Sequence, residues 1–338
     1  MANIWGSKDF LLPLFAIGLG STIYKHEKKI INYINVIYTI FASYGILQIF
    51  SFQCGLFEQI LPWDALYISN LAEHNFYQGN LLRYFGTMDM NTQYQVLVPF
   101  LLMFIWLNKS IIKNLKLLYV NTLLGLGFLT FSLERSPILM SLIFFSIWKF
   151  KAVITDWKKI AFTSLIVLFV LFNFNSLSSN LANKELTSEA WVRLSNAIYL
   201  NFNNDAAVQA RQSEKWKPSI QIIKDHPLGI GLADVSPAAN GKYTEYINFN
   251  NCHNNYLSYL VAYGYFGGIF IIGLLILLLY DLKKLPSKYR YFGYGLTVSY
   301  FCMAFFINIF IDRQGMLFFL LVGYLFSIMG TKKLTIKW

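Results

Sequence analysis

Apolar runs about as long as a membrane-spanning helix recur along the whole chain. A spanning helix needs about 20 mostly apolar residues, and shorter ones occur in bundles. The pattern predicts an all-α fold, a polytopic transmembrane helix bundle of about nine or ten spans that forms one integral membrane domain over residues 1–338. The predicted spans are 9–24, 30–50, 94–107, 115–133, 137–150, 160–177, 256–280, 291–311 and 316–330.

Composition supports a membrane protein over a soluble one. Hydrophobic residues make up 56% of the chain and charged residues 13%, whereas soluble domains carry about 25% charged residues. The net charge of +11 could suggest a nucleic-acid partner. We expect no nucleic acid and a lipid bilayer instead, because most basic residues stand in short clusters between apolar runs.

The basic clusters predict the orientation of the chain. Most of the 28 lysines and arginines fall in the connections 25–29, 109–116, 149–159, 283–290 and the C-terminal 332–337. Short connections rich in lysine and arginine face the cytoplasm. An odd number of spans with a cytoplasmic C-terminus places the N-terminus outside, unless one further short span or re-entrant segment exists.

The remaining connections are then extracytoplasmic. They comprise 51–93, 134–136, 178–255 and 312–315. Loops as long as 51–93 and 178–255 usually carry function, so we expect the second to hold part of the site. Within it, Pro218 is expected to begin a helix that carries Ile222 and Ile223 on one face.

The cysteines indicate no metal site. Cys54, Cys252 and Cys302 have no metal-type spacing, and Cys302 lies in an apolar run. A disulfide between Cys54 and Cys252 requires that both loops face an oxidising compartment, and spacing alone does not establish it.

Arg135, in Leu-Glu-Arg-Ser-Pro, stands where one span ends on the outer side and the next begins. An arginine beside hydrocarbon is costly, and it marks either a functional site or an ion pair. The structural alternatives are a salt bridge with Glu134 and extension of the side chain to the lipid headgroups.

Arg211 and the stretch Pro227-Leu-Gly-Ile-Gly231 suggest an anion site. The guanidinium fork matches phosphate oxygens, and glycines let backbone N–H groups approach an anion. The alternative is a solvated basic helix followed by a turn.

His253, in Cys-His-Asn-Asn-Tyr-Leu, precedes a predicted span. A helix N-terminus disfavours the imidazolium form, and a neutral imidazole is what a general base requires. The alternative is a capping or structural histidine. Further along, Gly264, Gly267 and Gly268 suit close helix packing.

Taken together, the order, spacing and sidedness of these motifs resemble the O-antigen polymerase and O-antigen ligase superfamily of bacterial envelope glycan assembly. The resemblance covers about residues 80–325. The motifs that carry it are Arg83-Tyr-Phe-Gly-Thr, Glu-Arg135-Ser, Arg211, Trp216, Pro227 to Gly231, His253-Asn254-x-x-Leu257, and Gly264 with Gly267. Glu134 departs from the family, which usually has serine before the first arginine.

The resemblance implies a fold like that of the GT-C membrane glycosyltransferases and a bacterial cytoplasmic-membrane enzyme with its site on the extracytoplasmic, periplasmic face. The donor would be a polyprenyl (undecaprenyl) diphosphate-linked oligosaccharide, transferred with inversion and with neither metal nor cofactor. Flippase and chain-length regulator proteins are implied as partners.

The resemblance also implies residue roles. Arg135 and Arg211 would stabilise the diphosphate, and His253 would prepare the acceptor hydroxyl. The expected substrate-binding residues are Arg83, Arg313, Asn254, Tyr256, Trp216, Gly229 and Gly231.

Polymerase and ligase share this donor chemistry and differ in the acceptor. The short chain and an N-terminal third without family pattern favour a polymerase of repeat units for O-antigen, capsule or a related surface polysaccharide. A ligase would transfer the glycan to lipopolysaccharide core or protein. A transporter or flippase of lipid-linked sugars is the alternative from another class, although no internal repeat supports it.

Overall fold

The structure, a computed structural model, describes residues 2–53, 91–131, 135–149, 216–231, 254–305, 309–310 and 312–335. Within these ranges every regular element is a helix, which confirms the predicted all-α class. The chain divides into two compact units. One comprises 1–26, 142–148 and 201–338, and the other 27–141 and 149–200.

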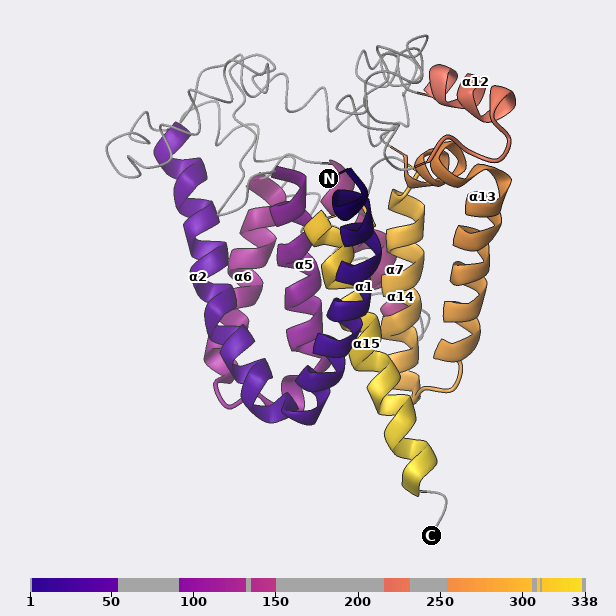
Figure 1. Ribbon diagram of the computed structural model, residues 1–338. Helices are drawn as coiled ribbons and strands as arrows, with labels where there is room; N and C mark the ends of the chain where they lie inside the picture. The colour runs from indigo at the N-terminus through magenta and orange to yellow at the C-terminus, as the bar shows by residue number, and fades with distance from the viewer. Residues whose placement is uncertain are drawn as a thin grey trace. The chain divides into compact units, whose positions relative to one another are not determined.

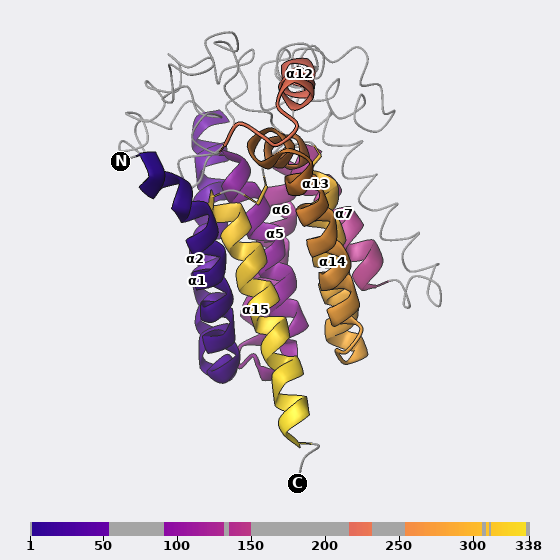
Figure 2. The same cartoon turned by 45° about the vertical axis from the view of Figure 1, so that its right-hand side comes forward.

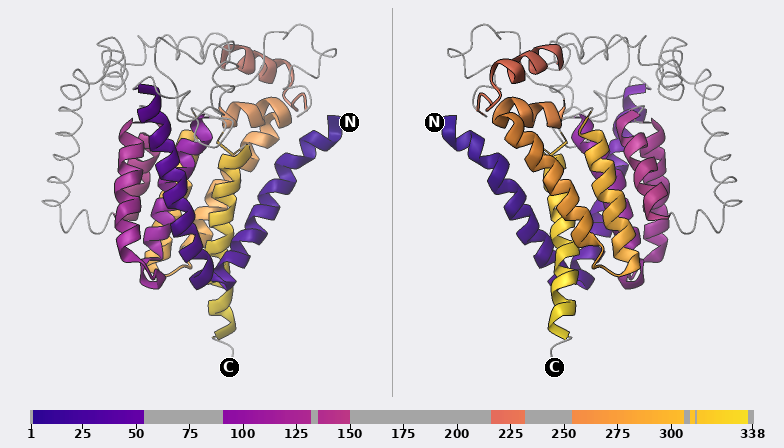
Figure 3. Two further views of the ribbon diagram at one scale, coloured as in Figure 1. Left: turned by 90° about the vertical axis from the view of Figure 1, so that its left-hand side faces the viewer. Right: turned by 90° about the vertical axis from the view of Figure 1, so that its right-hand side faces the viewer.

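Two long helices of the first unit, α1 (Ala2–Lys25) and α15 (Asp312–Thr335), pack closely together (Figures 1 and 3). Glycines permit the approach: a Cβ on Gly20 would lie 2.0 Å from the Leu320 oxygen, and one on Gly323 would lie 2.2 Å from the Ile17 oxygen. Small residues at such interfaces are typical of membrane helix pairs.

The other helices of this unit are α12 (Lys217–Asp225), α13 (Asn255–Leu282), α14 (Ser287–Met303) and the second half of α7 (Arg135–Trp148). Aromatic rings join several of them. Phe292 of α14 lies 5.0 Å from Phe144 and 5.6 Å from Trp148 of α7, between ring centroids. Offset and edge-to-face pairs of this kind stabilise a packed core.

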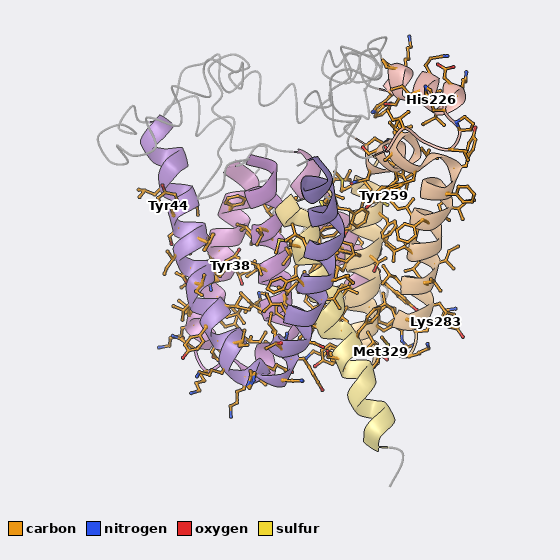
Figure 4. All side chains as sticks on the ribbon, viewed as in Figure 1. Tyr38, Tyr44, His226, Tyr259, Lys283 and Met329 are labelled. Atoms are coloured by element: carbon orange, nitrogen blue, oxygen red, sulfur yellow. The ribbon has the colours of Figure 1, made fainter. Side chains whose placement is uncertain are left out.

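The second unit contains α2 (Glu27–Gln53), α5 (Asn91–Leu107), the 3₁₀-helix η1 (Lys109–Ile111), α6 (Leu115–Phe131) and the first half of α7. Buried amides join α2 to α6: Asn121 Nδ2 donates to Asn35 Oδ1 at 2.9 Å, and Thr39 donates to Asn121 Oδ1 at 2.8 Å. Interhelical amide and hydroxyl pairs are a common link between membrane helices. Tyr38, labelled in Figure 4, lies on α2 and is also buried.

Helices cover most of each predicted apolar run that falls in the described residues, and 160–177 lies outside them. Among the described helices, Glu27–Leu47 and Asn255–Leu282 are long and apolar enough to cross a membrane. The shorter apolar helices are Val96–Leu107, Leu115–Leu129, Leu139–Trp148 and Gly315–Gly330. A helical membrane protein accounts for this pattern, and the span count and GT-C arrangement stay predictions.

One predicted boundary was wrong. The run 291–311 was expected to form one span, but α14 ends at Met303 and a turn follows at Ala304 and Phe305. The Ala304 carbonyl accepts a hydrogen bond from the backbone N–H of Asn255 at 2.8 Å. A tertiary contact therefore takes up this carbonyl just past the helix end, where apolarity alone predicted continuation.

Candidate functional site

Helix α12 begins as the sequence predicted. Trp216 is its N-cap residue, and Pro218 stands in its first turn, where a missing N–H is harmless. Ile222 and Ile223 are buried. They form one apolar cluster with Ile230 and with residues of α13: Val261, Leu257 and Leu260.

Helix α13 is broken at Gly264, whose φ of 61° and ψ of −152° are non-helical. The break divides α13 into a first arm, residues 255–263, and a second arm, residues 265–282. Figure 2 shows α12 lying over the first arm. A break of this kind leaves backbone carbonyls and N–H groups without helical partners.

The Pro227–Gly231 turn supplies those partners. Ile230 and Gly231 donate their N–H groups to the carbonyls of Val261 and Ala262, both at 2.9 Å. In return, Tyr265 donates its N–H to the Pro227 carbonyl at 3.1 Å. The hydrogen bonds that the helix break opens are therefore completed by a turn from a distant part of the chain.

Glycine is required on both sides of this contact. A Cβ on Gly229 would lie 2.4 Å from the Ala262 oxygen, and one on Gly264 would lie 2.0 Å from the Pro227 oxygen. Gly229 and Gly231 also have φ values of 86° and 88°, which side chains disfavour. We call residues 227–231 and 261–265 the glycine interlock.

The next two glycines bring the arms of α13 together. A Cβ on Gly267 would lie 2.2 Å from the Tyr259 oxygen, and one on Gly268 would lie 2.8 Å from a methyl of Leu260. The predicted close packing is thus present, and it lies within one bent helix.

Asparagines hold the start of α13. Asn254 is its N-cap, and its side-chain oxygen accepts the N–H of Leu257 at 3.1 Å. Asn255 is fully buried, and its side-chain oxygen accepts the N–H of Phe310 at 3.2 Å. The helix start is therefore joined to the connection between α14 and α15.

Tyr256 strengthens this junction. Its hydroxyl donates to the Phe301 carbonyl at 2.8 Å, and its ring lies 4.2 Å from that of Phe305, between centroids. The first arm is held at its beginning by α14 and at its end by the interlock. Such fixation at both ends is what precise placement of a reactive group needs.

Five of the predicted substrate-binding residues lie on the elements that meet at the first arm: Trp216, Gly229, Gly231, Asn254 and Tyr256. The N–H groups of Gly229 and Gly231 donate to the carbonyls of His226 and Ala262, and the side chains of Asn254 and Tyr256 bond to Leu257 and Phe301. These groups therefore bond within the protein, and the anion cradle expected from the glycines stays a prediction.

The predicted catalytic residues are less fully described. Arg135 is the first residue of α7, in the half that belongs to the second unit, and Arg313 is the second residue of α15. Neither side chain is described. Arg83, Arg211 and His253 lie outside the described residues, as do Cys54 and Cys252. In the sequence, His253 directly precedes the Asn254 cap.

Asn255 is the residue that the sequence reading missed. Its Nδ2 is buried without a hydrogen-bond partner in the described part of the chain, like Nε1 of Trp216. The doubled asparagine at the predicted helix start was the available signal. Among the described residues, no group of three or more His, Cys, Asp or Glu is placed to hold a metal ion.

Comparison with known proteins assigns this region. Residues 120–272 match the family described as O-antigen ligase. The matched segment includes most of α6, α7, α12 and both sides of the glycine interlock. No curated protein matches the chain. The family match supports the resemblance that the motifs show to the O-antigen polymerase and ligase superfamily, over residues 120–272 of the chain.

Proposed function

We propose that the protein polymerises polyprenyl diphosphate-linked oligosaccharide repeat units into a surface polysaccharide, at the extracytoplasmic face of the bacterial cytoplasmic membrane. The observation that carries this proposal is the family match over residues 120–272. It encloses Arg135, Arg211 and His253, together with the interlock and capped helix start that follow them.

The proposed reaction is a metal-independent inverting transfer. The acceptor hydroxyl oxygen attacks the anomeric carbon of the donor glycan and forms the new glycosidic bond. The bond from that carbon to the diphosphate breaks, and its electron pair leaves with the lipid diphosphate. The hydroxyl proton passes to His253. Arg135 and Arg211 stabilise the negative charge of the leaving group by charge-assisted hydrogen bonds.

The start of α13 supports a base at His253. Asn254 caps the helix, so the preceding histidine stands next to the positive end of the helix dipole in sequence. That end disfavours imidazolium and favours the neutral imidazole that can accept a proton. Asn255 and the interlock fix the first arm of α13 at its two ends, and a fixed arm is the kind of support that a reactive group next to it in sequence requires.

A ligase is the second candidate, because the matched family is described as O-antigen ligase. A ligase would use the same donor and leaving group, and its acceptor would be lipopolysaccharide core or a protein. The polymerase is supported by the N-terminal third, which carries no family pattern, since polymerases vary with the sugar repeat.

Deletion of the gene distinguishes these functions by the surface glycan that remains. Loss of a polymerase leaves single repeat units on the acceptor, which is the result that we expect. Loss of a ligase leaves long chains on the lipid carrier. Accumulation of single lipid-linked units on the cytoplasmic side would indicate a transporter, and an unchanged glycan would exclude all three.

A further inference from the structure

The second arm of α13 presents one continuous exposed apolar face. Its members are more than one third exposed and recur at helical spacing, so they line one side of the helix. They are Tyr265, Phe266, Ile269, Phe270, Ile272, Ile276, Leu277 and Tyr280. We call this face the exposed stripe.

The second arm has the length of a bilayer core. Residues 265–282 rise about 27 Å at 1.5 Å per residue, close to the roughly 30 Å of hydrocarbon in a bilayer. Tyrosines stand near both ends of the stripe, where aromatic residues gather at membrane interfaces. Lys284, just beyond the far end, has its Nζ 5.1 Å from the Tyr280 ring centroid.

The break at Gly264 therefore marks a membrane boundary. The second arm crosses the hydrocarbon. The first arm and α12 lie at the Gly264 end of the second arm, and Lys283 lies at its other end. Figure 4 labels His226 and Tyr259 near the first of these ends and Lys283 at the second. Under the predicted orientation, the end near Gly264 is the extracytoplasmic one.

Leu228 extends the stripe at this boundary. It is the most exposed of the large apolar side chains described, at 75%. The interlock holds it beside the second arm: its carbonyl carbon is 2.6 Å from the position of a Cβ on Gly264, and the preceding Pro227 carbonyl accepts the N–H of Tyr265. Phe266, one residue further on, is 71% exposed.

The exposed side of α12 has a different chemistry. Lys217, Gln221, Lys224 and Asp225 are exposed there around one exposed apolar residue, Ile220, and Gln221 donates to the Asp225 carboxylate at 2.9 Å. α12 therefore carries polar groups, and the turn that follows it carries the apolar Leu228. This arrangement is typical of an interfacial segment, whose charged groups lie at the lipid headgroups and whose apolar side chain lies among the acyl chains.

We propose that Leu228 docks into the outer leaflet of the bilayer, so that the Pro227–Gly231 turn anchors α12 and the first arm of α13 at the membrane surface. The occupant of this surface is the acyl chains of the surrounding lipids. Leu228 continues this lipid-facing surface, because it adjoins Tyr265, where the exposed stripe of a spanning helix begins. The inference is independent of the proposed reaction.

Spin labels at three positions test the anchor. In full-length protein with Cys54, Cys252 and Cys302 replaced by serine, single cysteines are introduced as Leu228→Cys, Gln221→Cys and Ile269→Cys. The labelled proteins are placed in phosphatidylethanolamine and phosphatidylglycerol vesicles. Collision rates are then measured with oxygen, which concentrates in lipid, and with a water-soluble nickel chelate.

We expect the label at 228 to resemble that at 269, with an oxygen-to-nickel ratio several-fold above that at 221. A ratio equal to that at 221 would place Leu228 in water and overturn the proposal. A label at 228 that neither reagent reaches would also overturn it, because a second copy or another protein would then cover the turn.

A second measurement keeps the native cysteines. Leu228→Trp and Gln221→Trp each add one tryptophan to the eight present. In vesicles whose acyl chains carry bromine, we expect additional quenching of the tryptophan at 228 and little at 221. Equal quenching in the two variants would refute the anchor even if the cysteine-free protein failed to fold.

Discussion

Gly229 and Gly264 lie against each other, so that a Cβ on Gly229 would stand 2.6 Å from the backbone nitrogen of Gly264. The two glycines belong to sequence motifs that have no resemblance to each other. In the structure they form one contact, in which a turn completes the backbone hydrogen bonds of a broken helix. This contact sets the direction of the first arm of α13, at whose start Asn254 follows His253.

The interlock predicts a strong and position-specific effect of alanine. Gly229→Ala and Gly264→Ala each place a Cβ within 2.4 Å of a carbonyl oxygen at a positive φ, and a backbone conformation that side chains disfavour costs about 1–3 kcal/mol by itself. We expect both to lower the midpoint of thermal unfolding in detergent by several degrees. Gly273→Ala is the matched control, because nothing lies within 4 Å of its Cβ position, and it should leave the midpoint unchanged or raised. Equal midpoints for all three variants would contradict the interlock.

Two asparagine caps allow a test that separates stability from activity. Asn254 accepts the N–H of Leu257 at 3.1 Å, and Asn114 accepts that of Leu117 at 3.0 Å at the start of α6. Replacing either asparagine by alanine should cost about 1 kcal/mol. Because only Asn254 adjoins His253, we expect only Asn254→Ala to reduce glycan transfer per folded molecule. Asn254→Ser retains a cap and should recover most of the activity. Equal losses of transfer from both alanine variants would show that the effect is one of stability alone.

His253 should be far more sensitive than the other histidine of this region. Removal of a general base typically slows a reaction about 10²–10⁴-fold, so we expect His253→Ala to abolish polymer in a complementation assay at unchanged protein level. His226→Ala is the control. His226 is the C-cap residue of α12 and has no proposed role in the transfer, so full-length polymer is expected. Polymer from the His253 variant would remove this residue from the mechanism.

Substitutions that remove the charge of an arginine, or keep the charge and change the shape of the side chain, test whether Arg135 and Arg211 bind the diphosphate. Arg135→Ala and Arg211→Ala should each abolish polymer, and Arg211→Lys should impair it, because lysine keeps the charge and loses the planar fork that binds phosphate oxygens. Arg193→Ala, in the same predicted loop as Arg211, is the control and should retain activity. Normal polymer lengths from both alanine variants would refute the diphosphate role.

The sequence alone predicted the helices well, since helix formation and burial depend on local patterns. Pro218 marked the beginning of α12, and Ile222 and Ile223 formed its buried face as expected. Helices cover most of each apolar run within the described residues. The resemblance to the O-antigen polymerase and ligase superfamily followed from the order of short motifs, which needs no coordinates.

The boundaries set by distant contacts could not be predicted in this way. The run 291–311 reads as one apolar span, yet α14 ends at Met303, just before the carbonyl of Ala304 that accepts the N–H of Asn255. The buried role of Asn255 was missed for the same reason, because its partner Phe310 is far away along the chain.

The amino-acid sequence by itself determined the membrane character of this protein, the beginning of α12 and the order of its motifs, because hydrophobic periodicity, proline and charge act over a few residues. Only the tertiary structure decided that α13 is two arms and that the Pro227–Gly231 turn closes the break between them. The physical reason is that a broken helix exposes backbone groups whose partners must come from elsewhere in the chain, and nothing local to Gly264 specifies which segment supplies them.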